Sequence, residues 1–382
     1  MCRMSVTDDQ LVGALSAIDD PELRRDIHTL GMLRGAAVAG DRAHVVIAMP
    51  AHDHPSRGHL HDLITRAATG LGLAGVDIDF TEMTEDEQAA LRSQLIGDPG
   101  SSAGSQGSHG HAEGRSIPMA EPGSKTRVLL IASGKGGVGK SSVTTNVAIA
   151  LAQRGKRVGV IDADVWGFSI PRMLGAERGP VVIDQMVVPV EANGVRMISM
   201  GFFANEDQPV IWRGPMLHKA LEQFLTDVYW DDPDYVLIDL PPGTGDIALS
   251  IAQFLPRGEV YVVTTPQPAA QKVAQRAAFM AQKVRLEVRG IIENMSWFTG
   301  DDGKRYEIFG SGGGQELADQ LDVPLIGKVP LVGVLREGGD TGNPVVVADP
   351  ENEASLVFSE IARAIDEDLQ PTKRFHPELK LI

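Results

Sequence analysis

The sequence predicts an α/β protein in which helices cover a mostly parallel sheet, preceded by a small N-terminal α+β domain. After Thr126, short apolar runs recur with helical segments between them, and each run is continuous rather than alternating. Before Arg92 the pattern is mixed, and a stretch rich in Gly, Ser and Pro separates the two regions. Continuous apolar runs are typical of strands buried on both faces, as in a parallel sheet covered by helices.

Residues 1–93 have the pattern of a compact α+β domain. Helices are predicted in LVGALSAIDDPEL, ending at Asp20-Pro21, and in HLHDLITRAATGL, whereas AHVVIAM and AGVDIDFTEM are predicted strands. Residues 94–125 are nearly free of large apolar side chains, so they cannot bury enough surface to offset the entropy of ordering. We expect them to form a flexible linker.

Residues 126–370 are expected to form the second domain, and residues 371–382 a tail. Its strands are predicted in RVLLIAS, RVGVIDAD, DYVLIDLPP, EVYVVTTPQ, VRGIIENMS and VPLIGKVP. The segment EASLVFSEIARAIDEDL predicts a closing amphipathic helix with an acidic outer face.

Composition excludes several classes of function. The formal net charge of −16 argues against non-specific binding to nucleic acid or to an anionic membrane, which both require clustered Lys and Arg. No apolar run approaches the ~18–20 residues that span a bilayer, and the N-terminus lacks the apolar core of a signal peptide. We therefore expect a cytoplasmic protein. Its one cysteine, Cys2, excludes a disulfide within the chain and any cysteine-clustered metal site.

The first predicted strand of the second domain runs directly into a phosphate-binding motif. Gly134 to Ser141 matches G-x-x-x-x-G-K-[ST], the P-loop, between a strand and a helix. Backbone N–H groups of such a loop cradle phosphates, Lys140 is expected to reach the β- and γ-phosphates, and Ser141 to bind Mg²⁺. The expected nucleotide-binding residues of this loop are Gly134, Lys135, Gly136, Gly137, Val138, Gly139, Lys140, Ser141 and Ser142.

Two further carboxylate stretches fall where a P-loop ATPase needs them. VGVIDAD places Asp162 and Asp164 at the end of the second strand, and YVLIDLPPGTGD places Asp239 as the Walker-B acid, with Gly243 to Asp246 as a mobile switch. We expect Asp239 to bind Mg²⁺ directly or through water. For Asp162, a helix cap and a metal ligand remain alternatives.

The sequence also indicates which nucleotide base the site binds. A GTPase normally offers N-K-x-D after a strand, and this tetrapeptide is absent. Asn294, after VRGIIE, is placed to hydrogen-bond an adenine edge, although a buried turn asparagine is the structural alternative. ATP is therefore the expected nucleotide.

Several segments together resemble one family. The loop K-G-G-V-G-K-S is similar to the deviant P-loop of the MinD, ParA and nitrogenase iron-protein class, and PVIWRGPMLHKALEQFL, IIENMS, YEIFGSGGG and LREGGDTGNPVV resemble the Mrp/ApbC family of P-loop ATPases. AIDDPELRRDIHTLGML is similar to the metal–sulfur cluster assembly domain that precedes the ATPase in many members. The resemblance implies iron–sulfur cluster carriers.

Roles for individual residues follow from this resemblance. It implies a homodimer in which Lys135 reaches the partner's nucleotide, and in which Asp164 orients the attacking water close to Mg²⁺. The catalytic residues are thus expected to be Lys135, Lys140 and Asp164, and the Mg²⁺ site Ser141, Asp164 and Asp239. A solvent-exposed loop lysine is the alternative for Lys135.

The expected cluster site departs from the family. The resemblance implies a C-x-x-C pair after ENMS in each subunit, which would hold a [4Fe–4S] cluster across the dimer. Thr299 and Asp302 stand at these positions, and His54-Pro55 stands where the N-terminal domain usually has Cys-Pro. A hydroxyl and a hard carboxylate are poor ligands for such a cluster, which binds soft thiolates. The chain is therefore not expected to hold the family's cluster in the family's way.

A group of histidines is the remaining candidate for metal binding. AHDHPSRGHLHD contains His52, His54, His59 and His61. Imidazole suits zinc, iron or nickel, but His59 and His61 are two residues apart on a predicted helix and do not share a face. Exposed histidines at a loop–helix junction are the favoured interpretation.

Three functions remain open. The first is an ATP-hydrolysing dimer in iron–sulfur cluster assembly or transfer to apoproteins, with assembly proteins or apoproteins as partners. The second is a nucleotide-switched scaffold or regulator without its own cluster. The third is a MinD- or ParA-like positioning ATPase on membrane or DNA, although the acidic terminal helix and a tail with only three basic residues, Lys373, Arg374 and Lys380, disfavour it.

Overall fold

The computed structural model describes residues 6–97, 116–164, 167–203, 214–243 and 246–371. Its chain divides into two compact units. The N-terminal unit contains Met1–Ser101 together with Pro180–Pro189 and Asp227–Asp231, and the larger unit contains the rest of the chain. The N-terminal unit thus includes two segments from within residues 126–370, which composition alone does not indicate.

The N-terminal unit is built on a three-stranded sheet. Strand β3 (Leu33–Ala39) pairs antiparallel with β4 (Arg42–Met49), which pairs parallel with β5 (Gly75–Glu82). Its helices are α1 (Asp8–Leu15), α2 (Arg57–Gly70) and α3 (Glu85–Ile96), and two short pairs, β1 (Asp19–Asp20) with β2 (Arg25–Asp26) and β8 (Val181–Ile183) with β9 (Met186–Val188), complete it. The α+β pattern is therefore present.

Two details of this unit differ from the sequence-based expectations. The first helix ends at Leu15, not at Asp20-Pro21, because Asp19 and Asp20 extend into β1 and pair with β2. Strand β3 and helix α3 were not foreseen. Helix α3 begins with a capping box in which Thr84 and Glu87 satisfy each other's backbone N–H groups, a signal that the sequence does carry.

The larger unit contains an eight-stranded, mostly parallel sheet. The strand order is β10 (Val190–Ala192), β11 (Val195–Ser199), β7 (Val158–Asp162), β12 (Tyr235–Asp239), β6 (Arg127–Ser133), β13 (Glu259–Thr264), β14 (Glu287–Glu293) and β17 (Leu325–Lys328). Only β10 pairs antiparallel within this sheet. All six predicted strands are present, and the fold class is confirmed.

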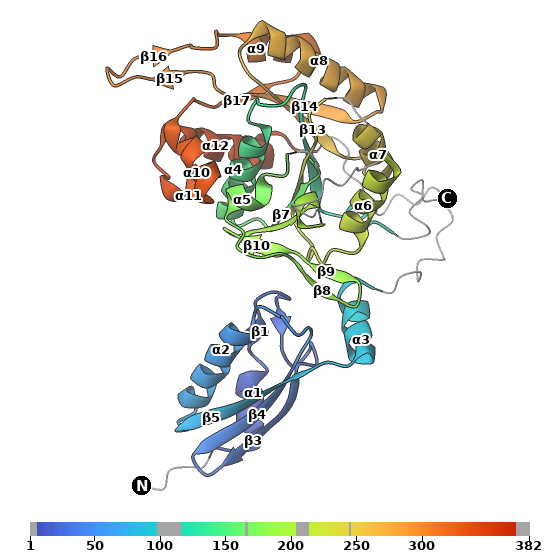
Figure 1. Ribbon diagram of the computed structural model, residues 1–382, viewed down its shortest axis with the longest axis vertical. Helices are drawn as coiled ribbons and strands as arrows, with labels where there is room; N and C mark the ends of the chain where they lie inside the picture. Colours follow the sequence, from blue (N-terminus) through green and yellow to red (C-terminus); the bar gives the residue numbers. More distant parts are fainter. Residues whose placement is uncertain (1–5, 98–115, 165–166, 204–213, 244–245, 372–382) are drawn as a thin grey trace. The chain divides into compact units, whose positions relative to one another are not determined.

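Helices cover both faces of this sheet. Figure 1 shows α4 (Lys140–Gln153), α5 (Ile170–Leu174), α10 (Gly333–Thr341), α11 (Val345–Ala348) and α12 (Glu353–Arg363) on one side, and α6 (Gly214–Thr226) and α7 (Asp246–Phe254) on the other. The remaining helices are α8 (Pro268–Lys283) and α9 (Gly313–Leu321), and strands β15 (Phe298–Thr299) and β16 (Arg305–Tyr306) form a separate hairpin. The carboxyl ends of β6, β7 and β12 meet at one edge, where ligands bind in open α/β sheets.

The expected linker is shorter than its composition indicates. Residues up to Ile96 belong to α3, and Ile117 and Met119, on either side of Pro118, are buried. Residues 98–115 of the expected linker and 372–382 of the expected tail lie outside the described residues. No helix in the described parts of the chain is long and apolar enough to span a membrane.

Candidate nucleotide-binding site

The turn after β6 has the glycine geometry of a phosphate-binding loop. Gly137 and Gly139 have φ values of +78° and +79°, in the left-handed region that L side chains rarely adopt. Gly134 has no space for a side chain, because a Cβ there would lie 2.3 Å from the backbone carbon of Val273. The loop leads into the 14-residue helix α4, whose first N–H groups have no acceptor within the helix. This arrangement suits an anion such as phosphate.

A buried carboxylate accepts hydrogen bonds from three polar side chains at the start of α4. Asp239, at the end of β12, is fully buried and accepts hydrogen bonds from Lys140 Nζ, Ser141 Oγ and Thr144 Oγ1, each at 2.6 Å. Thr144 was not predicted, although it lies one helical turn after Lys140 and therefore on the same face of α4. The structure thus brings Lys140, Ser141 and Asp239 together as the sequence predicts.

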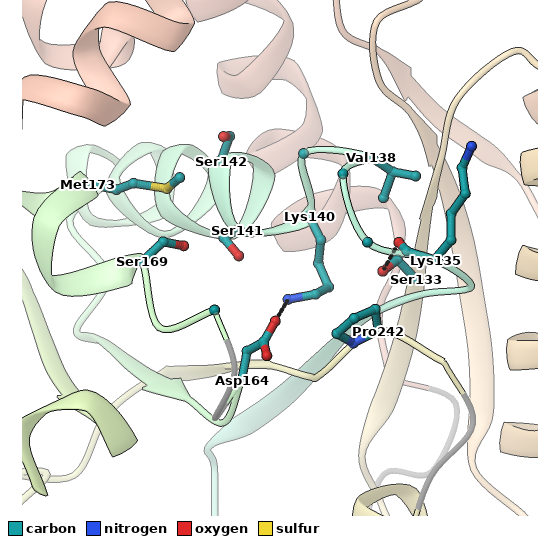
Figure 2. A pocket seen from close by; sticks show the side chains of 14 residues that line it. Ser133, Lys135, Val138, Lys140, Ser141, Ser142, Asp164, Ser169, Met173 and Pro242 are labelled. Atoms are coloured by element: carbon teal, nitrogen blue, oxygen red, sulfur yellow. Dashed lines mark hydrogen bonds and ion pairs between the residues drawn. The ribbon is translucent and has the colours of Figure 1, made fainter. Parts of the chain in front are cut away.

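Asp164, two residues after the end of the neighbouring strand β7, faces the same lysine. Its Oδ2 lies 4.0 Å from Lys140 Nζ, and the residue is largely buried while still lining the cavity. Figure 2 shows the amino group of Lys140 directed at this carboxylate from across the cavity. Asp164 and Ser141 therefore both line the cavity, whereas Asp239 lies behind Lys140 and Ser141 and is fully buried.

Asp162 acts as a cap and does not line the cavity. Its Oδ1 accepts the backbone N–H of Asp164 at 3.2 Å, and its Oδ2 accepts the hydroxyl of Ser199 at 3.0 Å and the N–H of Ile170, the first residue of α5, at 3.3 Å. Burial away from water, and then the nearby charge of Asp239, raise the pKa of Asp162 to about 7. Of the two alternatives for this residue, the structure shows the capping role.

Two adjoining cavities lie along this edge. The first, of about 400 Å³, is lined by the P-loop from Lys135 to Ser142 and by Asp164, Ser169 and Pro242. The second, of about 210 Å³, is lined by Asn294, Pro330, Leu331, Val332 and Leu335. Gly139, Ser142 and Met173 line both, so the two cavities adjoin. The first cavity has the more polar lining of the two, and the pair matches the phosphate and base ends of a nucleotide.

Asn294 holds an available acceptor in the second cavity. The residue is 2% exposed, and its Nδ2 donates to the carbonyl of Val138 at 2.9 Å, which fixes the orientation of the amide. Its Oδ1 is buried and accepts no hydrogen bond from any residue that the structure describes. The exocyclic amino group of adenine can donate to this oxygen, whereas guanine presents an acceptor at the same position.

Lys135 lines the first cavity but does not join the lysine–carboxylate cluster. Its Nζ is 3.5 Å from Gln267 Oε1, and Figure 2 shows the side chain pointing away from Lys140 and Asp164. The hydroxyl of Ser133 donates to the carbonyl of Lys135 at 3.1 Å and holds its backbone in place. The structure therefore leaves the amino group of Lys135 directed away from the phosphate cavity of its own chain.

Sequence reasoning missed the residues that close the second cavity. These come from Pro330 to Leu335, at the start of α10, and from Met173 on α5. Arg172 Nε donates to the carbonyl of Asp340 at 2.9 Å and fastens α5 to α10. The segments LIGKVPL and LREGGDTGNPVV contain most of these residues, but apolar and glycine-rich sequence alone does not indicate which of them contact a ligand.

The hairpin at the expected cluster site is closed by its own polar contacts. Thr299 Oγ1 and Trp297 Nε1 both donate to Glu353 Oε2 at 3.1 Å. Asp302 accepts the N–H of Lys304 at 3.0 Å and the hydroxyl of Tyr306 at 2.9 Å, and these bonds lower its pKa. An ionised carboxylate and a hydroxyl do not fit a [4Fe–4S] cluster, and the one thiol of the chain, Cys2, lies outside the described residues.

The four histidines do not form a common site, and the expectation that all of them are exposed is wrong for His54, which is buried. His52 Nδ1 lies 2.5 Å from Glu82, an interaction that raises its pKa, whereas the buried His54 contacts the hydroxyl of Ser56 through Nδ1 at 2.6 Å. His59 is exposed, and His61 lies 3.5 Å from Asp62. Within the described ranges, no group of three or more His, Cys, Asp or Glu side chains is arranged to hold a metal ion.

The sheet and the cavity at its carboxyl edge define a P-loop nucleotide-binding protein. Residues 124–366 match the family model described as NUBPL iron-transfer P-loop NTPase, and residues 8–80 match the iron–sulfur cluster assembly protein family. The chain belongs to the iron-transfer P-loop NTPase family, and the resemblance found in its sequence motifs is thereby confirmed.

Curated relatives and a solved structure agree with this assignment. The chain is 45% identical to an iron–sulfur cluster carrier protein of Mycobacterium leprae, over 92% of this chain and 90% of the relative. It is 37% identical to a protein of the same name from Synechocystis, over 94% and 97%. A nucleotide-binding protein from Archaeoglobus fulgidus, solved with ADP, superposes with a TM-score of 0.53 and 33% identity, over 66% of this chain and 95% of that one.

Proposed function

We propose that the protein is an ATP-hydrolysing homodimer that acts in iron–sulfur cluster assembly or transfer to apoproteins. The observation that carries the nucleotide part is the convergence of Lys140, Ser141 and Asp164 on one cavity behind a glycine-restricted loop. The iron–sulfur part is supported by family membership and by the names of relatives that match the chain almost end to end.

The same residues suggest how the phosphates are handled. Lys140 is held between Asp239 and Asp164. A phosphate bound in the cavity would form a further ion pair with its amino group. Ser141 and Asp164 are the donors expected to hold Mg²⁺, which would neutralise charge that develops on the phosphate oxygens. Asp164 is also within the cavity where it can orient a water molecule, and Asp239 positions Lys140 and Ser141 from behind.

ATP is the nucleotide that the second cavity favours. The buried Oδ1 of Asn294 is an acceptor among mainly apolar neighbours, so the cavity favours a base that donates a hydrogen bond to this oxygen. Lys135 is then free to act outside its own phosphate cavity, which supports the expectation that it serves the nucleotide of a second subunit.

The hairpin favours a mechanism in which a partner protein, and not this chain, supplies the ligands of the iron–sulfur cluster. Because Thr299 and Asp302 are used in contacts within the chain and offer no thiolate, the cluster is cargo whose sulfur ligands come from a partner protein. A nucleotide-switched scaffold without a cluster of its own is the second candidate, and the same observation favours it.

One experiment separates these two functions. A [4Fe–4S] donor protein and an apo-acceptor enzyme are mixed anaerobically, with and without the protein and Mg·ATP, and recovery of acceptor activity is followed. Acceleration by the protein that depends on ATP supports a role in transfer. No acceleration, with ATP still bound and hydrolysed in the same sample, contradicts transfer and leaves the scaffold.

A further inference from the structure

Two segments of the second domain's sequence form one element inside the N-terminal unit. Strands β8 and β9 pair as a hairpin within Pro180–Pro189. The N–H of Val187 donates to the carbonyl of Asp227 at 2.8 Å, and the N–H of Tyr229 donates to the carbonyl of Val187 at 2.9 Å. The hairpin and the segment Asp227–Asp231 are therefore joined, and together we call them the insert.

The insert completes the hydrophobic core of the N-terminal unit. Ile183, Met186 and Val188 are at most 1% exposed and belong to the same apolar cluster as the helices and sheet of that unit. Tyr229 belongs to it as well, and its hydroxyl donates to the carbonyl of Leu23 at 2.9 Å. Side chains buried this completely are part of the core itself, so a shift of the insert disturbs the packing around it.

Charged groups fix the insert at two further points. The carboxylate of Asp231 is 2% exposed and lies 3.0 Å from Arg25, on β2. Asp184, at the turn of the hairpin, lies 3.8 Å from Arg92, on α3. The insert is thus held by apolar packing, by the ion pair between the buried Asp231 and the partly exposed Arg25, and by α3, each on a different part of the N-terminal unit.

Along the sequence, the insert follows shortly after helix α5, whose Met173 lines the nucleotide cavities. Helix α5 ends at Leu174, and Pro180 starts the insert six residues later. Met173 of α5 lines both the phosphate cavity and the base cavity, and the first N–H of α5 is held by Asp162. The chain that leaves the insert at Asp231 enters β12 four residues later, at Tyr235. Strand β12 ends at Asp239, the carboxylate that holds Lys140.

We propose that α5 and the insert form a mechanical link through which nucleotide binding changes the N-terminal unit. A nucleotide that fills both cavities contacts Met173 and fixes the position of α5, and the short chain from Leu174 to Pro180 passes this restraint to the core of the N-terminal unit. The link rests on the proposed function only in that a nucleotide must bind the P-loop. Because coupling is reciprocal, changes in the insert must also alter nucleotide affinity.

Amide hydrogen exchange on the full-length chain tests this link, with and without Mg²⁺ and a non-hydrolysable ATP analogue. In the wild type, the analogue is expected to slow exchange in α4, and to slow it by about fivefold or more at Val187, at Tyr229 and in α3. The double variant Tyr229→Phe/Asp231→Asn removes the bond to Leu23 and the charge facing Arg25. It is expected to keep the response in α4, to lose the response in the N-terminal unit, and to shift the Kd of the analogue by a similar factor.

The matched control is Asp77→Asn, which removes an exposed ion pair with Arg42 in the same unit but away from the insert. The control is expected to respond like the wild type. If α4 responds in the wild type while the N-terminal unit does not, or if the double variant responds like the control, the link is refuted and nucleotide binding stands. If α4 itself does not respond, nucleotide binding at the P-loop is refuted, and the link with it.

Discussion

The two nucleotide cavities and the β15–β16 hairpin differ in how their polar groups are used, although Asn294, which lines the second cavity, precedes the hairpin by only a few residues. At the first cavity, Lys140 and Ser141 bond to Asp239 and yet line a space of about 400 Å³ together with Asp164. At the second cavity, Asn294 keeps a buried acceptor that no described residue satisfies. In the hairpin, Thr299 and Asp302 are both engaged within the chain. The difference teaches that two neighbouring regions of one fold can differ in chemistry: one is arranged to receive a ligand, and the polar groups of the other are engaged within the chain.

The largest expected effect is at the cavity. Lys140→Ala removes the charge that Asp239 and Asp164 hold in place, and loss of one partner of a buried ion pair typically costs about 3–5 kcal/mol. Affinity for ATP is expected to fall at least about 100-fold, with turnover lost, in equilibrium binding and phosphate-release assays. Lys283→Ala, which removes an exposed lysine at the end of α8, is the control and should behave as the wild type. Full ATPase activity in Lys140→Ala would overturn the site.

A smaller effect is expected at the base cavity. Asn294→Ala removes the buried acceptor and is expected to weaken ATP binding about tenfold, the value of a single hydrogen bond to a buried group, while GTP binding changes little. Competition between the two nucleotides for the wild type and the variant measures this ratio. An unchanged preference for ATP in the variant would mean that other groups select the base.

Changes in the hairpin are expected to leave the cavity untouched. Glu353→Ala removes the acceptor shared by Trp297 and Thr299, and the loss of two bonds of about 1 kcal/mol or less each loosens the hairpin. Exchange of the Gly300 amide, which donates to Lys304, is expected to become about tenfold faster, while ATP turnover stays within about twofold. Glu351→Ala, at an exposed position nearby, is the control. A large loss of turnover in Glu353→Ala alone would show that the two regions are coupled.

The smallest effect is a dependence of the hairpin on pH. Hydrogen bonds from Lys304 and Tyr306 lower the pKa of Asp302 below its value in the unfolded chain. The ionised carboxylate therefore stabilises the hairpin fully at a pH above the unfolded pKa, and this stabilisation is lost as the pH falls through the folded pKa. NMR signals of the Lys304 amide are therefore expected to shift in acid, below about pH 4, and to remain constant towards neutral pH. In Asp302→Asn this transition should be absent; its persistence would assign it to another group.

Much of the architecture could be predicted because strong local patterns agree with the fold. The six apolar runs are six of the seven parallel strands of the sheet, and β11 is the one that they do not include. The P-loop, Asp164, Asp239 and Asn294 came together because the carboxyl ends of parallel strands share an edge. What the sequence did not indicate depends on long-range packing. Short strands such as β8 and β9 carry weak patterns, and their place in the N-terminal core is set by contacts with residues far away in sequence. The capping role of Asp162 likewise required the position of α5.

The most direct test of the central claim is to count nucleotide, iron and sulfide in one sample. Full-length protein is reconstituted anaerobically with iron and sulfide, separated from unbound ions and titrated with Mg·ATP, beside the variant Thr299→Cys/Asp302→Cys. We expect the wild type to bind about one ATP per chain with no stoichiometric iron, and the variant to gain iron because it supplies the missing thiolates. About two iron and two sulfide ions per wild-type chain, as one [4Fe–4S] cluster shared by a dimer requires, would contradict the account.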